Sequence, residues 1–201
     1  MMELLDKANI FRFHDQLIKQ YGAHSNAALG WNEAAGQEAR FRVLSGIGQL
    51  NGRTVLDAGC GHADLFAYLV KLYPQLHYYG IEQVPAFLQV AVERYIHLPA
   101  VKLYEGDFME AGLPGADYTI ACGSLNYHSC DEAFIFNAIR KLFYNSRIGF
   151  GFNLLQKIEP ASGFLRAYEP ADVIAFCHTL TNSVRLFENY YGDDYSVFMY
   201  H

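Results

Sequence analysis

From Arg53 onward, short β-rich runs alternate with helix-length amphipathic segments, and this alternation is the feature that most constrains the fold. Parallel strands are joined by crossover helices, so the pattern predicts a mostly parallel, doubly wound α/β sheet with helices on both faces. Ligands of such sheets bind beyond the carboxyl ends of the strands, and we expect the functional residues there. The first five strands are expected at 54–56, 77–81, 101–104, 117–122 and 148–154.

The segments outside this alternation are expected to add helices at the start of the chain and two strands at its end. Apolar residues recur at helical spacing before Gly22, and a second helix is expected after Asn32 as its N-cap. Ser129 and Glu132 match a capping box for the helix that follows the fourth strand. The first helical stripe comprises Ile10, Phe13, Leu17 and Tyr21, and the last two strands span 184–187 and 196–200.

Length and organisation predict one domain. The chain has 201 residues, close to the roughly 100–200 of a typical domain, and it contains no visible repeat, linker or low-complexity segment. We therefore expect a single domain over residues 1–201. Within it, residues 1–50 would form a helical lid or extension and residues 51–201 a Rossmann-like core.

Composition and charge disfavour several classes of protein. The net charge is −6 and no run of Lys or Arg occurs, whereas nucleic-acid binding depends on basic patches that neutralise phosphates. The longest apolar run, at 65–70, is far shorter than the ~20 residues of a membrane span. The four cysteines lack CxxC spacing, as in a reduced chain. We therefore expect a soluble, cytoplasmic protein with neither a nucleic-acid nor a membrane partner.

The sharpest functional signal is a strand that runs into a glycine turn and then into a helix. Residues 55–64 read VLDAGCGHAD, and Gly59 and Gly61 permit the positive φ and the close backbone approach that a bound ligand needs. Glu82 ends the next strand, where a carboxylate can accept hydrogen bonds from both hydroxyls of a ribose. The pattern therefore indicates a cofactor that contains a ribose.

Two classes of cofactor compete for this turn. A dinucleotide fingerprint has a third glycine where this chain has Asp64, and it places a pyrophosphate at the helix N-terminus. Asp64 and Asp57 would both repel a pyrophosphate, whereas an acid at position 57 suits a cation such as an ammonium or a sulfonium group. A nucleotide-dependent oxidoreductase of the NAD type therefore stays open as the alternative function.

In these segments the chain resembles the class I S-adenosylmethionine-dependent methyltransferases. The matching motifs are DAGCG at 57–61, YGIE at 79–82, EGDF at 105–108 and DYTIACG at 117–123. The resemblance implies a seven-stranded Rossmann-like sheet whose last strand is antiparallel and lies beside the fifth. It also implies an enzyme that transfers a methyl group from the cofactor S-adenosylmethionine to an acceptor.

The resemblance implies a role for each matching residue of the first two motifs. Gly59 and Gly61 would form the turn beneath the methionine part of the cofactor, and Asp57 would face its amino group. Glu82 would hold the two ribose hydroxyls. Ala63 stands where many members of the family have a further glycine, and we expect this small residue to be tolerated.

Four more residues are implied as cofactor contacts. Asp107 would accept a hydrogen bond from the adenine amino group, and Phe108 would line the adenine slot. Cys122 would offer its carbonyl group near the cofactor amine. Arg40, on the helix before the first strand, would grip the cofactor carboxylate with its two-pronged guanidinium group. A solvent-exposed arginine is the alternative for this position.

The loop after the fourth strand, residues 123–129, is where the family places acceptor contacts. His128 is the best candidate for a general base by residue type and position, with a surface or capping role as the alternative. The loop lacks the prolines of enzymes that methylate nucleic-acid amino groups, and it lacks the acids that bind magnesium in catechol-type members. We therefore expect no metal and a small-molecule acceptor.

Aromatic residues make up 15% of the chain, which fits both a large core and a pocket wall. Most rings are expected on core stripes, whereas a smaller set lies near the expected cofactor and acceptor and would attract a sulfonium. A sealed acceptor cavity would instead favour a non-catalytic adenosylmethionine-binding module, which is the third hypothesis. The expected pocket set comprises Tyr21, Trp31, Phe108, Tyr127, Phe164 and Tyr168.

Overall fold

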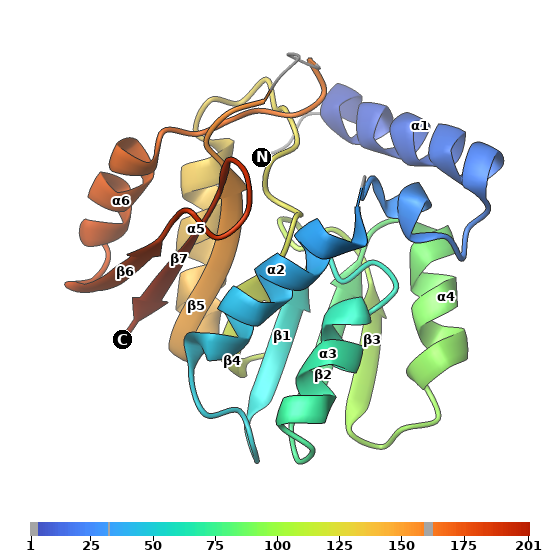
Figure 1. Ribbon diagram of the computed structural model, residues 1–201, viewed down its shortest axis with the longest axis horizontal. Helices are drawn as coiled ribbons and strands as arrows, with labels where there is room; N and C mark the ends of the chain where they lie inside the picture. The colour runs from blue at the N-terminus through green and yellow to red at the C-terminus, as the bar shows by residue number, and fades with distance from the viewer. Residues whose placement is uncertain (1–3, 32, 159–162) are drawn as a thin grey trace.

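The computed structural model describes residues 4–31, 33–158 and 163–201, which form a seven-stranded sheet flanked by helices (Figure 1). The strands are β1 (Thr54–Ala58), β2 (His77–Glu82), β3 (Val101–Glu105), β4 (Ala116–Ala121), β5 (Ser146–Leu155), β6 (Ser183–Phe187) and β7 (Asp194–Tyr200). The helices are α1 (Leu4–Tyr21), α2 (Ala34–Leu44), α3 (Asp64–Leu72), α4 (Pro85–Tyr95), α5 (Phe134–Asn145) and α6 (Pro170–His178), with 3₁₀ turns η1 (Asn26–Leu29) and η2 (Ser45–Ile47).

The sheet has the strand order β3-β2-β1-β4-β5-β7-β6. Strands β1 to β5 pair in parallel, whereas β7 pairs antiparallel with both β5 and β6. The expected fold class is therefore confirmed, including the antiparallel last strand beside the fifth. Because the strand order reverses between β1 and β4, their carboxyl ends form a switch point of the kind where such sheets bind ligands.

Helices cover the two faces of the sheet in separate sets. Val55 and Leu56 are neighbours in β1 and point to opposite faces. Val55 joins a buried cluster with Phe66 of α3, and Leu56 joins another with Ile139 of α5. Helices α2 and α4 add to the first cluster and α6 adds to the second. Both faces of β1 are thus buried, which explains why the adjacent residues Val55 and Leu56 are both apolar.

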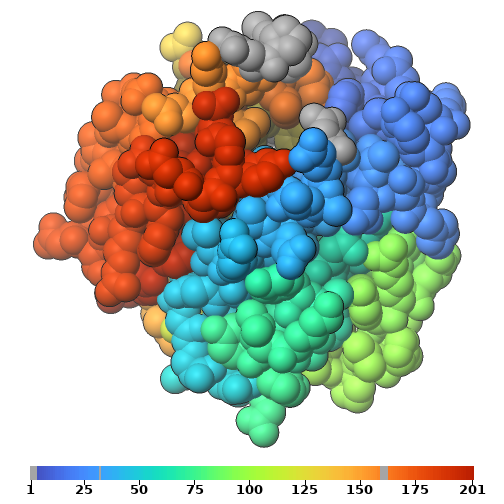
Figure 2. Space-filling view, in the orientation of Figure 1, coloured from blue at the N-terminus to red at the C-terminus, as the bar shows by residue number. Residues whose placement is uncertain are grey.

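Helix α1 lies across the end of the sheet to which the parallel strands point (Figure 1). Its buried residues, Asp6, Ile10 and His14, are spaced by four, so a single stripe faces the protein. The Asp6 carboxylate accepts hydrogen bonds from the Ser129 hydroxyl and the Cys130 amide, both at 2.9 Å. These bonds attach α1 to the loop after β4. On its other side, the N-terminal segment, blue in Figure 2, lies against the light green α4 segment.

The predicted capping box is wrong. Helix α5 begins at Phe134 and has no side-chain cap at its N-terminus. The Ser129 hydroxyl donates to Asp6 instead, so this serine docks α1 rather than capping α5. Glu132 is exposed.

The N-terminal helices agree with the predicted pattern except at their ends. The spacing predicts Tyr21 on the buried stripe, but Tyr21 is the last residue of α1 and is 49% exposed. The predicted N-cap Asn32 lies outside the described residues. Glu33 occupies the N-cap position of α2 and makes no side-chain cap hydrogen bond.

Replacing Asp6 with alanine should loosen α1 without disturbing the sheet. The substitution removes the acceptor of two hydrogen bonds, which we expect to weaken the docking of α1 by about 1–3 kcal/mol. Amide hydrogen exchange in α1, followed by mass spectrometry, should become roughly tenfold faster, while β1 and β4 keep their protection. Asp15→Ala, on the exposed side of the same helix, is the control. Equal exchange in the two variants would contradict the docking role of Asp6.

Candidate active site

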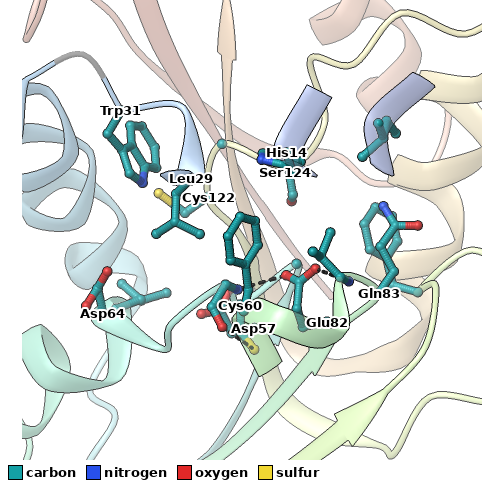
Figure 3. A pocket seen from close by; sticks show the side chains of 18 of the residues that line it. His14, Leu29, Trp31, Asp57, Cys60, Asp64, Glu82, Gln83, Cys122 and Ser124 are labelled. Atoms are coloured by element: carbon teal, nitrogen blue, oxygen red, sulfur yellow. Dashed lines mark hydrogen bonds between the residues drawn. The ribbon is translucent and has the colours of Figure 1, made fainter. Parts of the chain in front are cut away.

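The candidate site is a cavity at the carboxyl ends of β1, β2 and β4, beneath α1 and η1 (Figure 3). Ile10 and His14 reach it from α1, and Leu29 reaches it from η1. Most of the residues predicted to contact a cofactor meet on its wall, although they are far apart in the sequence. These are Asp57, Gly59, Gly61, Glu82, Phe108 and Cys122.

The turn after β1 depends on its two glycines. Gly59 and Gly61 have φ angles of 80° and 54°, in the left-handed region that favours glycine. A Cβ atom at Gly59 would lie 2.6 Å from the Cβ of Ser124, closer than side chains approach. The turn continues through Ala63, whose φ of 59° is rare for a residue with a side chain. The backbone of this turn therefore needs Gly59 both for its conformation and for the close approach of the loop after β4.

Glu82 connects the glycine turn to the start of α4. Its Oε2 accepts a hydrogen bond from the Gly61 amide at 2.9 Å, and its Oε1 accepts one from the Val84 amide at 2.7 Å (dashed lines in Figure 3). Burial raises the pKa of Glu82, although the backbone amides of Val84, Gly61 and Gln83 favour its charged form. Glu82 therefore holds the turn in place and also puts an acidic group on the cavity wall.

Asp57, at the end of β1, is a second buried acid in this cavity. The Tyr78 hydroxyl donates a hydrogen bond to its Oδ2 at 2.6 Å. Burial raises the pKa of Asp57 to about 7, with further contributions from the like charges of Glu82 and Asp64, and the bond from Tyr78 offsets only part of this rise. The carboxyl group is therefore partly protonated near neutral pH, and a cation beside it would favour its ionised form.

The charged side chains on the described wall of this cavity are all acidic, namely Asp57, Asp64 and Glu82. Asp64 lies at the start of α3 and pairs with the Arg94 guanidinium at 2.8 Å. Asp57 and Glu82 are bonded instead to neutral donors, a phenol and two backbone amides. Because a cationic ligand would stabilise both carboxylates, the wall favours a cation and opposes a pyrophosphate.

Two predicted cofactor residues do not line this cavity. Asp107 accepts a hydrogen bond from the Met109 amide, and the Lys7 ammonium group of α1 lies 2.9 Å from its Oδ2. Arg40 forms two contacts of 2.8 and 2.7 Å with Asp194, and Figure 2 shows the red C-terminal turn against α2 in this region. In the structure these charges connect α1 and α2 to the core. Their predicted contacts with adenine and with a carboxylate stay predictions.

The structure places His128, the predicted general base, outside the cavity, and its predicted role stays a prediction. His128 is exposed and does not line the cavity. The chain is extended here, because Tyr127 forms a β-bridge with Leu165, and neighbouring side chains of an extended segment point in opposite directions. Tyr127 consequently lines the cavity and His128 points away from it. The predicted loop therefore reaches the cavity through Tyr127 and not through His128.

A second cavity of about 440 Å³ adjoins the first. The two cavities share Leu29, Trp31, Gly123 and Tyr127. The rings of Phe13 and Phe164 stack in its wall, with 4.0 Å between their centroids. The aromatic side chains on its described wall are Phe13, Trp31, Tyr127, Phe164 and Tyr191.

The aromatic residues predicted for a pocket divide into two groups. Tyr21 is exposed at the end of α1, and Tyr168 lines a separate groove with residues of α5 and α6. The other four line one of the two cavities or both, and they are Trp31, Phe108, Tyr127 and Phe164.

Two side chains that precede α2 fill the space above the glycines. A Cβ atom at Gly61 would lie 2.9 Å from Cδ2 of Leu29, and one at Gly123 would lie 2.7 Å from Cη2 of Trp31. The first cavity accordingly measures only about 80 Å³, below the roughly 300 Å³ of small-ligand pockets. A ligand of nucleoside size therefore requires Leu29 and Trp31 to move.

The sequence offers His14 as a weaker candidate for a general base and Tyr127 as a pocket residue, but it does not predict that the two side chains meet. Nε2 of His14 lies 2.8 Å from the Tyr127 hydroxyl, and Nδ1 lies 3.0 Å from the Ala28 carbonyl oxygen. Both His14 and Tyr127 line the first cavity, and Tyr127 also lines the second. The available signal was the spacing of four between Ile10 and His14, which places a histidine on the buried stripe of α1.

Comparisons with known proteins identify the domain that carries this site. Residues 55–144 match the family model described as "Methyltransferase domain". A search of curated protein sequences gives no match. Magnesium protoporphyrin IX methyltransferase from Synechocystis, solved with bound S-adenosylhomocysteine (SAH), superposes with a TM-score of 0.72 at 13% identity, over 96% of this chain and 98% of that one.

Two further solved structures share the fold. For an O-methyltransferase family protein from Burkholderia thailandensis the TM-score is 0.68 at 14% identity, over 96% of this chain and 68% of that one. For human N-acetylserotonin methyltransferase in complex with S-adenosylmethionine (SAM) it is 0.62 at 13% identity, over 96% and 64%. Residues 55–144 therefore match a methyltransferase domain, and the chain has the fold of these solved methyltransferases, which confirms the predicted resemblance.

Within 4–31, 33–158 and 163–201, no helix combines the length and the apolar character that crossing a bilayer requires. The same ranges contain no group of three or more potential metal-ligating side chains.

Asp57→Asn should stabilise the protein above neutral pH. The pKa of Asp57 is raised from 3.8 to about 7, so its ionisation opposes folding progressively between these two values and fully above the higher one. The gain in free energy of unfolding, measured with urea, should grow from near zero at about pH 4 to as much as about 4 kcal/mol at about pH 8. Asp15→Asn is the exposed control, and a gain that does not change with pH would refute the buried-charge interpretation.

Proposed function

We propose that this chain transfers the methyl group of SAM to a small-molecule acceptor. One observation carries the proposal: the glycine turn of a methyltransferase domain opens on a cavity whose charged wall, in the described chain, consists of Asp57, Asp64 and Glu82. SAM carries an ammonium and a sulfonium group, which suit this acidic wall, whereas the pyrophosphate of a dinucleotide would be repelled. Solved structures of the same fold that contain SAH or SAM support this cofactor.

The residues on the wall fit this cofactor in chemistry. Gly59 and Gly61 leave the turn backbone open to close approach. Asp57 is a buried acid with a raised pKa, which the ammonium group would lower again. A carboxylate has about four acceptor sites, and the backbone amides do not use all of those of Glu82, so Glu82 can also receive the ribose hydroxyls. Phe108, which is buried on the same wall, would line the adenine slot.

The chain contributes mainly alignment and the exclusion of water. When bound, SAM would supply a methyl group on a sulfonium centre. The leaving group is the neutral thioether of SAH, which needs no acid to assist its departure. Holding acceptor and methyl group in line accelerates such a displacement by making it effectively unimolecular. Leu29 and Trp31 cover the site, which supports a role for residues 1–50 as a lid on a core formed by 51–201, within one domain.

The second cavity supports an enzyme over a non-catalytic binding module. It adjoins the cofactor cavity through Trp31 and Tyr127, and its volume of about 440 Å³ is that of a small-molecule pocket. A small-molecule acceptor is also favoured over nucleic acid, because the chain has a net charge of −6 and would repel a phosphate backbone. We further propose a cytoplasmic location, which the four free cysteines support.

Isothermal titration calorimetry tests the cofactor assignment. SAM and SAH should bind and NAD should not, and Glu82→Ala should weaken SAM binding at least tenfold, or about 1.4 kcal/mol. Glu105→Ala is the matched control, because Glu105 pairs with Glu82 in register on β3 but is exposed. Binding of NAD without SAM would assign the alternative oxidoreductase function. Equal SAM affinity in the two variants would remove Glu82 from the site.

A further inference from the structure

The phenol of Tyr127 and the imidazole of His14 form a pair where the two cavities meet. Nδ1 of His14 lies 3.0 Å from the carbonyl oxygen of Ala28, and a carbonyl only accepts hydrogen bonds. Nδ1 of the neutral ring therefore carries the proton, and Nε2 is left to accept the hydrogen bond from Tyr127, 2.8 Å away. The backbone of η1 thus sets the tautomer in which His14 is a proton acceptor toward Tyr127.

The surroundings of this pair keep His14 in its basic form. Its ring is 3% exposed and makes edge contacts with Phe87 and Tyr127, and burial lowers the pKa of His14 below its ordinary value. The titratable groups around the pair are Glu82, whose charge acts on Tyr127, and His62, which contacts the same Phe87 ring. Burial raises the pKa of the Tyr127 phenol, so Tyr127 keeps its proton unless it hands it to His14.

The second cavity, which Tyr127 also lines, has a mixed wall in which aromatic rings lie beside charged side chains. The charged residues on its described wall are Glu33, Arg40, Lys157, Asp193 and Asp194. Phe13 and Phe164 stack against each other, and the ring of Phe164 meets that of Tyr127 at 5.3 Å. Trp31 and Tyr191 add two more rings to the described wall. Aromatic side chains contribute large apolar area and favour stacked or edge contacts with other rings. An aromatic acceptor would exploit this wall better than a saturated molecule of equal volume.

We propose that this chain methylates a hydroxyl group on a planar aromatic acceptor held in the second cavity, and that Tyr127, with His14 behind it, receives the hydroxyl proton. The inference rests on the proposed function and specifies its acceptor and the path of the proton. A hydroxyl is the group that needs this pair, because its oxygen becomes a good nucleophile only as its proton leaves.

The step balances as follows. The acceptor oxygen forms a bond to the methyl carbon while the carbon–sulfur bond breaks and leaves its electron pair on sulfur. The acceptor proton moves to the Tyr127 oxygen as the Tyr127 proton moves to Nε2 of His14. The products are a methyl ether, a neutral thioether and an imidazolium ion, which later releases its proton to water. Tyr127 is then a catalytic residue, and His14 is a positioning residue that stores the proton.

The acceptor class is tested by binding alone, in the presence of SAH. The probes are a naphthol and its fully saturated counterpart, decahydronaphthol, titrated calorimetrically into the full chain. We expect the naphthol to bind at least tenfold more tightly and Phe164→Ala to abolish this preference. Tyr21→Ala removes an exposed ring outside both cavities and should keep the preference. Equal binding of the two alcohols, or binding of neither, would overturn the aromatic acceptor.

The proton path is tested by the ionisation of the bound naphthol, followed by its ultraviolet absorbance across pH. Both Tyr127→Phe and His14→Gln should shift this ionisation to higher pH, because the naphthol hydroxyl loses the group that accepts its proton. Both variants should also slow methyl transfer to the naphthol about a hundredfold. His128→Gln, on the exposed neighbour of Tyr127, should change neither quantity. An unchanged ionisation in His14→Gln, or an equal shift in His128→Gln, would overturn the proton path.

Measuring SAM affinity in every variant separates this inference from the proposed function. We expect Tyr127→Phe and His14→Gln to bind SAM within about threefold of the original chain, which also shows that they are folded. A chain that binds SAM but fails either naphthol test disproves the inference and leaves the proposed function standing. An original chain that binds no SAM disproves the proposed function itself.

Discussion

The carboxylate of Glu82 is the group on which the rest of the site depends. By accepting hydrogen bonds from the amides of Gly61 and Val84, it joins the end of β2, the glycine turn after β1 and the start of α4. A turn with two glycines of positive φ has little intrinsic preference for one shape, so an external acceptor is needed to hold it. The same group that shapes the turn is therefore also the acid that faces the cavity.

This arrangement buries the carboxylates of Asp57 and Glu82, and a bound cation would offset the cost of that burial. Asp57 lies beside Glu82 and has a pKa raised to about 7, so the site without a cation is electrostatically unfavourable at neutral pH. Such costs concentrate at functional sites, where a ligand relieves them. Helix α1 and η1 cover the two acids, and the polar attachments of α1 through Asp6 and Lys7 are compatible with the proposed lid.

Much of the fold and of the cofactor wall followed from local patterns, because these features depend on neighbours in the chain. The strand alternation, Gly59, Gly61 and Glu82 all lie in short motifs whose spacing reflects backbone geometry. Predictions failed where a side chain had a choice of distant partners. Ser129 has the spacing of a helix cap, yet it donates to Asp6 across 123 residues. Arg40 pairs with Asp194 in the structure, and its contact with a cofactor carboxylate stays a prediction.

The sequence by itself determined the strand–turn–helix unit and the acids that follow the strands, because each depends on short-range spacing and residue type. Only the tertiary structure decided which proton-accepting groups meet at the cavity. Tyr127 and not His128 faces inward, because an extended loop alternates its side chains and its pairing with Leu165 sets the register. His14 reaches Tyr127 over 113 residues because α1 docks across the carboxyl ends of the strands, a contact that no local pattern encodes.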